Sequence, residues 1–163
     1  MTFLGIDPGL QYSGFGVAKK AGPKIFLLDC GFLQMSPTKS LPDRIGIFYN
    51  YFEKLLDQYQ VNVLVLETPF LGKNAQNFLK LGYLRGILYL LASQKKLQLL
   101  EFSPCQVKLA VTGYGAASKA QVARVIKQLF PKLPVPVRED VSDALAVTLC
   151  GIWRRPGLLE NNH

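Results

Sequence analysis

Residues 61–67 read VNVLVLE, a short and mostly aliphatic run that ends in one acid. A run of this kind is typical of a strand that is buried on both faces, as in the parallel sheets of α/β proteins. Between Ser40 and this run, apolar side chains recur at helical spacing and predict a helix. A second, long helix is expected from about Asn74 to Lys96. The centre of the chain therefore predicts a buried strand between two helices.

Three strands are expected before this unit, and one strand and three helices after it. The first three strands, at 2–7, 14–19 and 24–34, are separated by turn-forming sequences and predict an antiparallel meander. A strand at 97–102 is followed by short helices, one of which begins with the capping box Ser118/Gln121, and by a last helix over 140–153. This order predicts an α/β domain with a mixed five-stranded sheet and helices on both faces.

The length and composition fit one packed domain. The chain has 163 residues, of which 49% are apolar, so residues 1–156 are expected to form a single domain and 157–163 a disordered tail. The most apolar stretch, 78–92, contains two basic residues and is too short to span a bilayer. No secretory leader is recognised, and three cysteines without metal-ligand spacing indicate reduced, buried thiols in a cytoplasmic protein.

Basic residues are concentrated in the middle of the chain. Residues 1–72 hold six basic and six acidic side chains, whereas 68–138 hold eleven basic residues and one acid, which gives +10 for that stretch. Such an asymmetry indicates a surface for a polyanion, and nucleic acid is favoured over a merely solubilising surface.

Four acids stand at the ends of expected elements. Asp7 closes the first strand and Glu67 closes the buried one, so both are expected at the sheet edge where open α/β sheets bind ligands. Asp140 and Asp143 are three residues apart at a helix start and share one face. Hard divalent cations prefer oxygen ligands, and two of them about 3.5–4 Å apart can promote phosphodiester cleavage. Because the only histidine is the last residue, a carboxylate metal site is the chemistry that this chain can support.

Each acid also has a simpler interpretation. Asp7 belongs to an Asp-Pro-Gly turn, and Glu67 could be a solvated strand end. An Asp-x-x-Asp pair at a helix start interacts favourably with the helix macrodipole and can act as a cap. Spacing alone does not make the four side chains converge, so metal binding is a hypothesis at this point.

Blocks of sequence that follow one another over about residues 1–150 resemble the RuvC family of bacterial Holliday-junction resolvases. The blocks are Gly5-Ile6-Asp7-Pro8-Gly9, Ser13-Gly14-Phe15-Gly16-Val17, Glu67-Thr68-Pro69-Phe70, Lys73-Asn74, Leu79-Lys80-Leu81-Gly82, Arg85-Gly86, Gln106-Val107-Lys108, Gly113-Tyr114-Gly115, Lys119-Ala120-Gln121-Val122 and Asp140-x-x-Asp143-Ala144-Leu145-Ala146. The resemblance implies an RNase H-like fold, a homodimer, and Mg²⁺-dependent paired nicking of like-polarity strands at four-way DNA junctions. It further implies a role in recombination and repair beside the RuvA–RuvB branch-migration complex.

The resemblance also assigns roles to individual residues. It implies that the catalytic, metal-binding carboxylates are Asp7, Glu67, Asp140 and Asp143, which would hold two Mg²⁺ ions that Mn²⁺ could replace. It implies that Lys108 and Lys119 face phosphate and that Phe70 stacks on an unpaired base. Without the resemblance, the lysines would be read as a solvated helix face and Phe70 as a core aromatic.

Two pairs of residues depart from the family pattern. Asn77-Phe78 replaces the usual Ser-Ala, and Tyr83-Leu84 replaces the usual Gln-Ala, on a helix that the family uses for its dimer interface. Gly82 and Gly86 remain one turn apart, so another backbone could still approach closely.

Three other functions are weighed against junction cleavage. A related nuclease of structured RNA would share the first strand but would not be expected to carry Phe70 or the lysine blocks. An actin-like or sugar-kinase-like ATPase needs two facing domains, which 163 residues cannot supply. A non-enzymatic junction-binding module would bind without metal-dependent cleavage.

Overall fold

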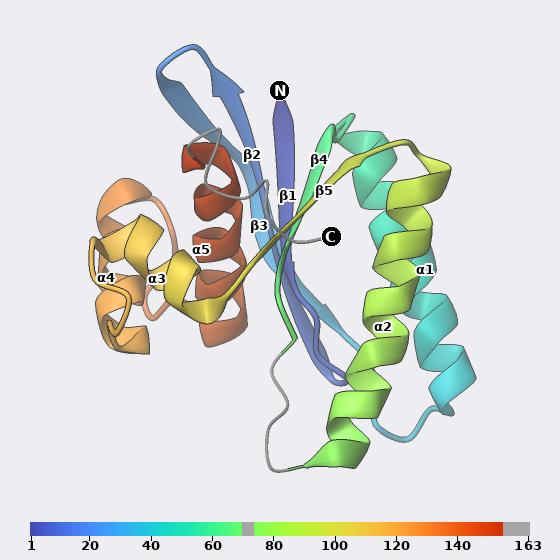
Figure 1. Cartoon of the computed structure of the whole chain (residues 1–163). Coiled ribbons are helices and arrows are strands. Elements are labelled where there is room, and N and C mark those ends of the chain that lie inside the picture. Colours follow the sequence, from blue (N-terminus) through green and yellow to red (C-terminus); the bar gives the residue numbers. More distant parts are fainter. Residues whose placement is uncertain (70–73, 155–163) are drawn as a thin grey trace.

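The computed structural model describes residues 1–69 and 74–154, which fold around one mixed sheet (Figure 1). The sheet has five strands in the order β3-β2-β1-β4-β5. β1 pairs antiparallel with β2 and β2 with β3, whereas β4 runs parallel to both β1 and β5. The predicted meander and the parallel central strand are therefore confirmed.

The strand bounds follow the sequence pattern closely. The strands are β1 (Thr2–Asp7), β2 (Tyr12–Ala21), β3 (Lys24–Gln34), β4 (Val63–Glu67) and β5 (Gln98–Phe102). β2 is longer than expected because its pairing with β3 runs from Tyr12 opposite Gln34 to Ala21 opposite Lys24. β4 begins two residues later than expected, since the Asn62 side chain instead accepts a hydrogen bond from the Thr2 N–H.

The helices lie in two groups on opposite faces of the sheet (Figure 1). One face carries α1 (Leu41–Gln58) and α2 (Ala75–Gln94); the other carries α3 (Pro104–Thr112), α4 (Lys119–Leu129) and α5 (Glu139–Trp153). The expected capping residues begin two of them: Ser40 accepts from the Asp43 N–H, and Ser118 forms a full capping box. Ser103 forms a further capping box at the start of α3. None of the helices described in this structure is long and apolar enough to cross a membrane.

Alternate residues of β4 pack into two separate hydrophobic cores, one on each face of the sheet. Val63 and Val65 face the α3–α4–α5 layer, while Leu64 and Leu66 face α1 and α2. This double burial explains why residues 61–67 have no polar side chain on either face between Asn62 and Glu67. β4 is thus held rigidly up to the residue that precedes its terminal acid.

Glycines in β1 and β2 allow α5 to lie against the backbone of the sheet. A Cβ on Gly5 would be 2.7 Å from the Ala144 carbonyl oxygen, and one on Gly14 would collide with the Asp140 carbonyl group. Thr148 of α5, which is fully buried, donates to the Gly16 carbonyl oxygen at 3.1 Å and thereby ties the helix to β2. The first turn of α5 is therefore set directly on the end of the β1–β2 hairpin.

The expectation of buried thiols was only partly correct. All three cysteines are free, but only Cys150 is buried, whereas Cys30 is half-buried and Cys105 is exposed. Cys105 lies in the first turn of α3, which projects toward solvent. The predicted tail at 157–163 lies outside the described residues.

Candidate active site

Asp7 and Glu67 come from adjacent parallel strands and reach the same edge of the sheet. Ile6 pairs with Leu66, so the acids that follow these residues stand side by side at the strand ends. The turn after β1 is closed by Ser13, whose hydroxyl accepts from the Gly9 N–H and donates to the Gly9 carbonyl. This edge is the one that the sequence predicted for a ligand site.

The first turns of α5 place Asp140 and Asp143 beside these strand ends. Gly14, the β2 partner of Asp7, lies under the backbone of Asp140. The capping interpretation of the helix acids is wrong, because the N-cap residue is Arg138 and no side chain caps the helix. The helix acids are therefore available for another role.

A cleft of about 270 Å³ joins most of the predicted site residues. It is lined by Asp7, Glu67 and Asp143 together with Lys108 and Lys119, and by apolar side chains of α3, α4 and α5. Asp140 is not part of this lining; it lies alongside, and its negative charge still raises the pKa of Asp7. The structure thus brings three predicted carboxylates and both predicted lysines to one cleft, with the fourth carboxylate at its margin.

Burial and mutual repulsion raise the pKa values of the three carboxylates that line the cleft. Burial, followed by the negative charges of Asp143 and Glu67, raises the pKa of Asp7 from 3.8 to about 7. Burial, followed by the charge of Asp143, also raises the pKa of Glu67. Burial raises the pKa of Asp143, although Lys119 opposes the shift. Ionising all three together is unfavourable unless positive charge is brought in.

Basic side chains supply part of that charge. Lys119, at the first position of α4, donates to Asp143 Oδ2 at 3.2 Å and also pairs with Glu139. Lys108 comes from α3 and acts on Glu67 through its charge, lowering the pKa of that acid as Lys119 does. Both lysines therefore face the carboxylates rather than solvent alone.

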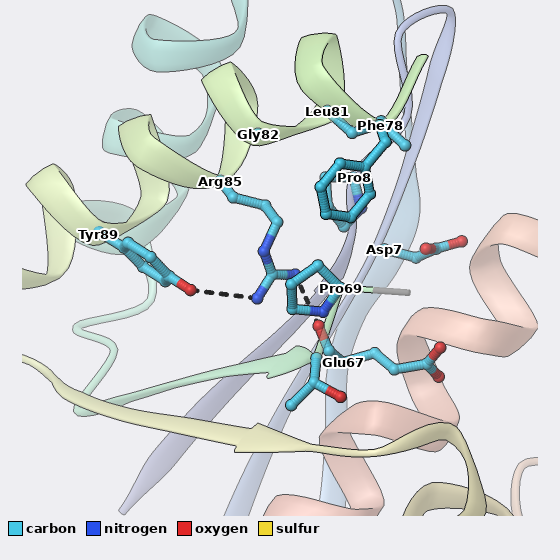
Figure 2. A pocket seen from close by; sticks show the side chains of 10 residues that line it. Asp7, Pro8, Glu67, Pro69, Phe78, Leu81, Gly82, Arg85 and Tyr89 are labelled. Carbon is cyan, nitrogen blue, oxygen red and sulfur yellow. Dashed lines mark hydrogen bonds between the residues drawn. The ribbon is translucent and has the colours of Figure 1, made fainter. Parts of the chain in front are cut away.

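A second pocket, of about 360 Å³, opens on the other side of Asp7 and Glu67 (Figure 2). Its apolar wall includes Pro8, Pro69 and Phe78, with the Phe78 ring beside Pro8 in Figure 2. Phe78 is one of the departures from the family pattern, and it lines this pocket rather than only altering the surface of α2.

Sequence reasoning missed a polar network around a buried arginine that holds the end of β4. Arg85, which is buried, donates from Nη1 to the Glu67 carbonyl oxygen at 2.6 Å (Figure 2). It also forms an ion pair with Glu101. The Tyr89 hydroxyl donates to the same Glu101 oxygen at 2.7 Å. One signal was present, because Arg85 interrupts an otherwise apolar helix face and Glu101 is the one acid of the basic stretch.

The chemistry of the donor set fits Mg²⁺. Within residues 1–69 and 74–154, no three His, Cys, Asp or Glu side chains form a ready metal-binding cluster. Mg²⁺ does not need one, since it is commonly bound by one or two carboxylates with waters and substrate phosphate. Three repelling carboxylates around one cleft meet that requirement.

Phe70, the predicted stacking residue, lies outside the described residues. Its neighbours Thr68 and Pro69 line the pocket beside Asp7 and Glu67. Its assignment rests on the family resemblance.

Comparison with known proteins identifies relatives over nearly the whole chain. The family model described as crossover junction endodeoxyribonuclease RuvC matches residues 3–151. The RuvC of Pelodictyon phaeoclathratiforme is 42% identical over 154 residues, covering 94% of this chain and 81% of that protein. The RuvC of Ruminiclostridium cellulolyticum is 37% identical over 163 residues, covering 99% of this chain and 98% of that protein.

Solved structures agree with this relationship. Thermus thermophilus RuvC in complex with a Holliday junction substrate superimposes with a TM-score of 0.85 at 27% identity, covering 92% of each chain. The RNase H-like sheet and its flanking helices are thus shared with a solved RuvC. The chain belongs to the RuvC family of crossover junction endodeoxyribonucleases.

Proposed function

We propose that this protein is a Holliday-junction resolvase, a divalent-metal-dependent endonuclease that makes paired nicks in two like-polarity strands of a four-way DNA junction. The observation that carries the proposal is the cleft in which Asp7, Glu67 and Asp143 face Lys108 and Lys119. Related RuvC proteins bear the name of this activity, and one of them was solved with a Holliday junction substrate.

Four carboxylates are proposed to hold two Mg²⁺ ions, for which Mn²⁺ could substitute. Asp7 and Glu67 would provide the rigid ligands, and Asp140 and Asp143 would complete the set from α5. When bound, the metal supplies Lewis acidity, which lowers the pKa of a coordinated water and stabilises charge on a leaving oxygen. Arg85 fixes the backbone of Glu67 through its carbonyl oxygen, so this ligand is positioned before substrate arrives.

The basic side chains would bind the scissile strand. Lys108 and Lys119 line the same cleft as Asp7 and Glu67 and would contact phosphate oxygens without reading sequence. Water attacks phosphorus in line with the bond to the 3′ oxygen, and breakage of that bond leaves a 5′-phosphate and a 3′-hydroxyl. Phe70 is proposed to stack on an unpaired base at the crossover.

A homodimer is proposed because paired nicks need two sites. α2 exposes large apolar side chains at Leu79, Tyr83 and Leu90, and a Cβ on Gly82 or Gly86 would meet nothing within 4 Å. Positions 79, 83, 86 and 90 follow the spacing of one helix face, as in helix pairs that pack along a seam. A second copy of α2 would cover this face, and the RuvA–RuvB complex would deliver the junction to the dimer.

Incubation with a labelled mobile four-way junction tests the proposal. In Mg²⁺, we expect symmetric nicks at the junction, no nicks in EDTA, and no nicks with Asp7→Asn. A linear duplex and a structured RNA are run in parallel. Junction binding without nicks would indicate a binding module, and cleavage of the RNA alone would indicate an RNA nuclease; either result contradicts the proposal.

A further inference from the structure

Arg138 holds the Asp140 carboxylate at the margin of the cleft. Its Nε donates to Asp140 Oδ1 at 3.1 Å, and its Nη2 donates to Oδ2 at 3.0 Å. This two-point geometry is the one in which a guanidinium binds a carboxylate or a phosphate most specifically. Both oxygens of a proposed metal ligand are therefore engaged by one arginine.

Two aromatic rings, one on β2 and one on β3, contact the same guanidinium. The Arg138 Cζ atom lies 4.0 Å from the ring centroid of Phe32 and 4.6 Å from that of Tyr12. The two rings meet edge to face at 5.9 Å, and Gln34 donates to the Tyr12 hydroxyl at 3.3 Å. Cation–π attraction to rings on β2 and β3 keeps the guanidinium in place independently of Asp140.

Exposure leaves the guanidinium able to take a second partner. The Arg138 side chain is 45% exposed, whereas that of Asp140 is 15% exposed. A guanidinium has five N–H donors, of which Asp140 receives two. A phosphate approaching from solvent can therefore be bound without moving the arginine off its rings.

Lys119 cannot perform the same exchange. Its ammonium group is a point charge that pairs with Asp143 in the cleft and with the exposed Glu139. Arg138 lies outside the lining of the cleft and touches a carboxylate that is likewise outside it. The two basic residues thus serve different parts of the site.

We propose that Arg138 exchanges Asp140 for a DNA phosphate when a divalent cation binds Asp140. The cation and the guanidinium compete for the same two carboxylate oxygens, and Tyr12 and Phe32 retain the released guanidinium at the site margin. Metal binding therefore creates an additional phosphate contact, and by linkage the phosphate favours metal binding. This inference rests on the proposed metal site and adds a residue that couples metal binding to DNA binding.

The release step is tested with Mg²⁺ alone, without DNA. In ¹⁵N-labelled protein, the Arg138 Nε–H resonance is assigned by its loss in Arg138→Gln. We expect Mg²⁺ to shift this resonance with the dissociation constant found by calorimetry, and Arg138→Gln to bind Mg²⁺ several-fold more tightly. Arg154→Gln is the matched control, because it removes one charge from the opposite end of α5, where Arg154 contacts Gln98. It should leave Mg²⁺ affinity unchanged.

Two outcomes separate the failure of this inference from that of the proposed function. If Mg²⁺ binds but the Arg138 resonance does not move, or if Arg138→Gln weakens Mg²⁺ binding, Arg138 is not a competitor and the exchange is wrong. If Mg²⁺ does not bind the unsubstituted chain, the metal site itself is wrong.

The phosphate step is tested in EDTA with Asp140→Asn, which breaks the pair without metal. In that background we expect Arg138→Gln to weaken binding of a fluorescent four-way junction about 5-fold or more, and Arg154→Gln to weaken it less than about 2-fold. Equal effects of the two arginine substitutions would overturn the assignment of Arg138 to phosphate.

Discussion

The four carboxylates of the site fall into a strand-borne pair and a helix-borne pair, and their surroundings differ. Asp7 and Glu67 end strands that are buried on both faces, and their pKa values are raised by burial and by other acids. Asp140 and Asp143 stand in the first turns of α5, where Arg138 and Lys119 form ion pairs with them.

This difference assigns separate tasks to the two pairs. The sheet and the Arg85 network fix the strand-borne acids at a set distance from each other, since neither can move without disturbing a core. Of the helix-borne acids, Asp140 can exchange Arg138 for a cation by side-chain movement. We infer that the strand pair defines where the metal lies and that Asp140 responds to it.

The largest effect is expected from removing a strand-borne charge. Asp7→Asn should lower the nicking rate on the order of 10³-fold or more, because metal catalysis is worth several kcal/mol. Junction binding should persist, as measured by electrophoretic mobility shift in EDTA. Asp57→Asn is the control, because Asp57 is an exposed partner of Lys95 on the other layer. Loss of junction binding in Asp7→Asn would mean that Asp7 is structural.

A substitution at Gly14, which lies between the strand-borne and helix-borne acids, tests whether the distance between these two pairs matters for nicking. Gly14→Ala places a methyl group against the Asp140 carbonyl and should cost about 1–3 kcal/mol of unfolding free energy by overpacking. It should also lower nicking, since it forces α5 away from Asp7. Gly46→Ala in α1 meets open space and should stabilise the protein by about 0.5–1 kcal/mol. Chemical denaturation and nicking assays compare the two, and unchanged nicking in Gly14→Ala would contradict the required spacing.

The lysines that are proposed to contact phosphate should affect binding more than chemistry. Lys108→Met should reduce the slope of log affinity against log salt by about 1, as expected for one lost phosphate contact. Fluorescence anisotropy at several salt concentrations measures this slope. Lys54→Met on the opposite layer is the control. An unaltered slope in Lys108→Met would mean that this lysine contacts no phosphate and simply lies on a solvated helix face.

The pH dependence should report the strand-borne pair. Because Mg²⁺ binds the ionised carboxylate and the pKa of Asp7 is about 7, Mg²⁺ affinity should rise as pH increases to about 7 and then level off. In the absence of metal, the contribution of Asp7 to the free energy of unfolding changes with pH in the opposite direction to the Mg²⁺ affinity. Between pH 3.8 and about 7 the folded protein retains a proton on Asp7 that the unfolded chain releases, so this acid lowers stability as pH rises.

Calorimetry and thermal unfolding across this pH range provide the measurement. Asp7→Asn should remove the contribution of Asp7 both to the pH dependence of Mg²⁺ affinity and to the pH dependence of stability. Mg²⁺ affinity that is flat from pH 5 to pH 8 would contradict a raised pKa at Asp7.

The fold was largely predictable because its signals are local. The apolar run at 61–67 locates β4, and the caps at Ser40 and Ser118 locate the starts of α1 and α4, without reference to the rest of the chain. The strand-end acids followed from the same reasoning, since parallel neighbours end at one edge of a sheet.

The remainder of the site depends on contacts between distant segments. Arg138 contacts rings on β2 and β3, and Arg85 contacts the end of β4, and nothing in the local sequence of either arginine specifies these partners. Similarly, the role of Gly14 follows from the path of α5 across the sheet, which no periodicity reveals. Residues whose function depends on packing across layers were therefore the ones that sequence reasoning missed.

Anomalous diffraction from crystals soaked in Mn²⁺ tests most directly whether the strand-borne and helix-borne acids form one metal centre. We expect a peak in the cleft within about 2.2 Å of a carboxylate oxygen of Asp7, with Glu67 and at least one helix-borne acid as further ligands. The peak should be absent in crystals of Asp7→Asn. A peak that persists in Asp7→Asn, or one that lies away from the cleft, would contradict the account.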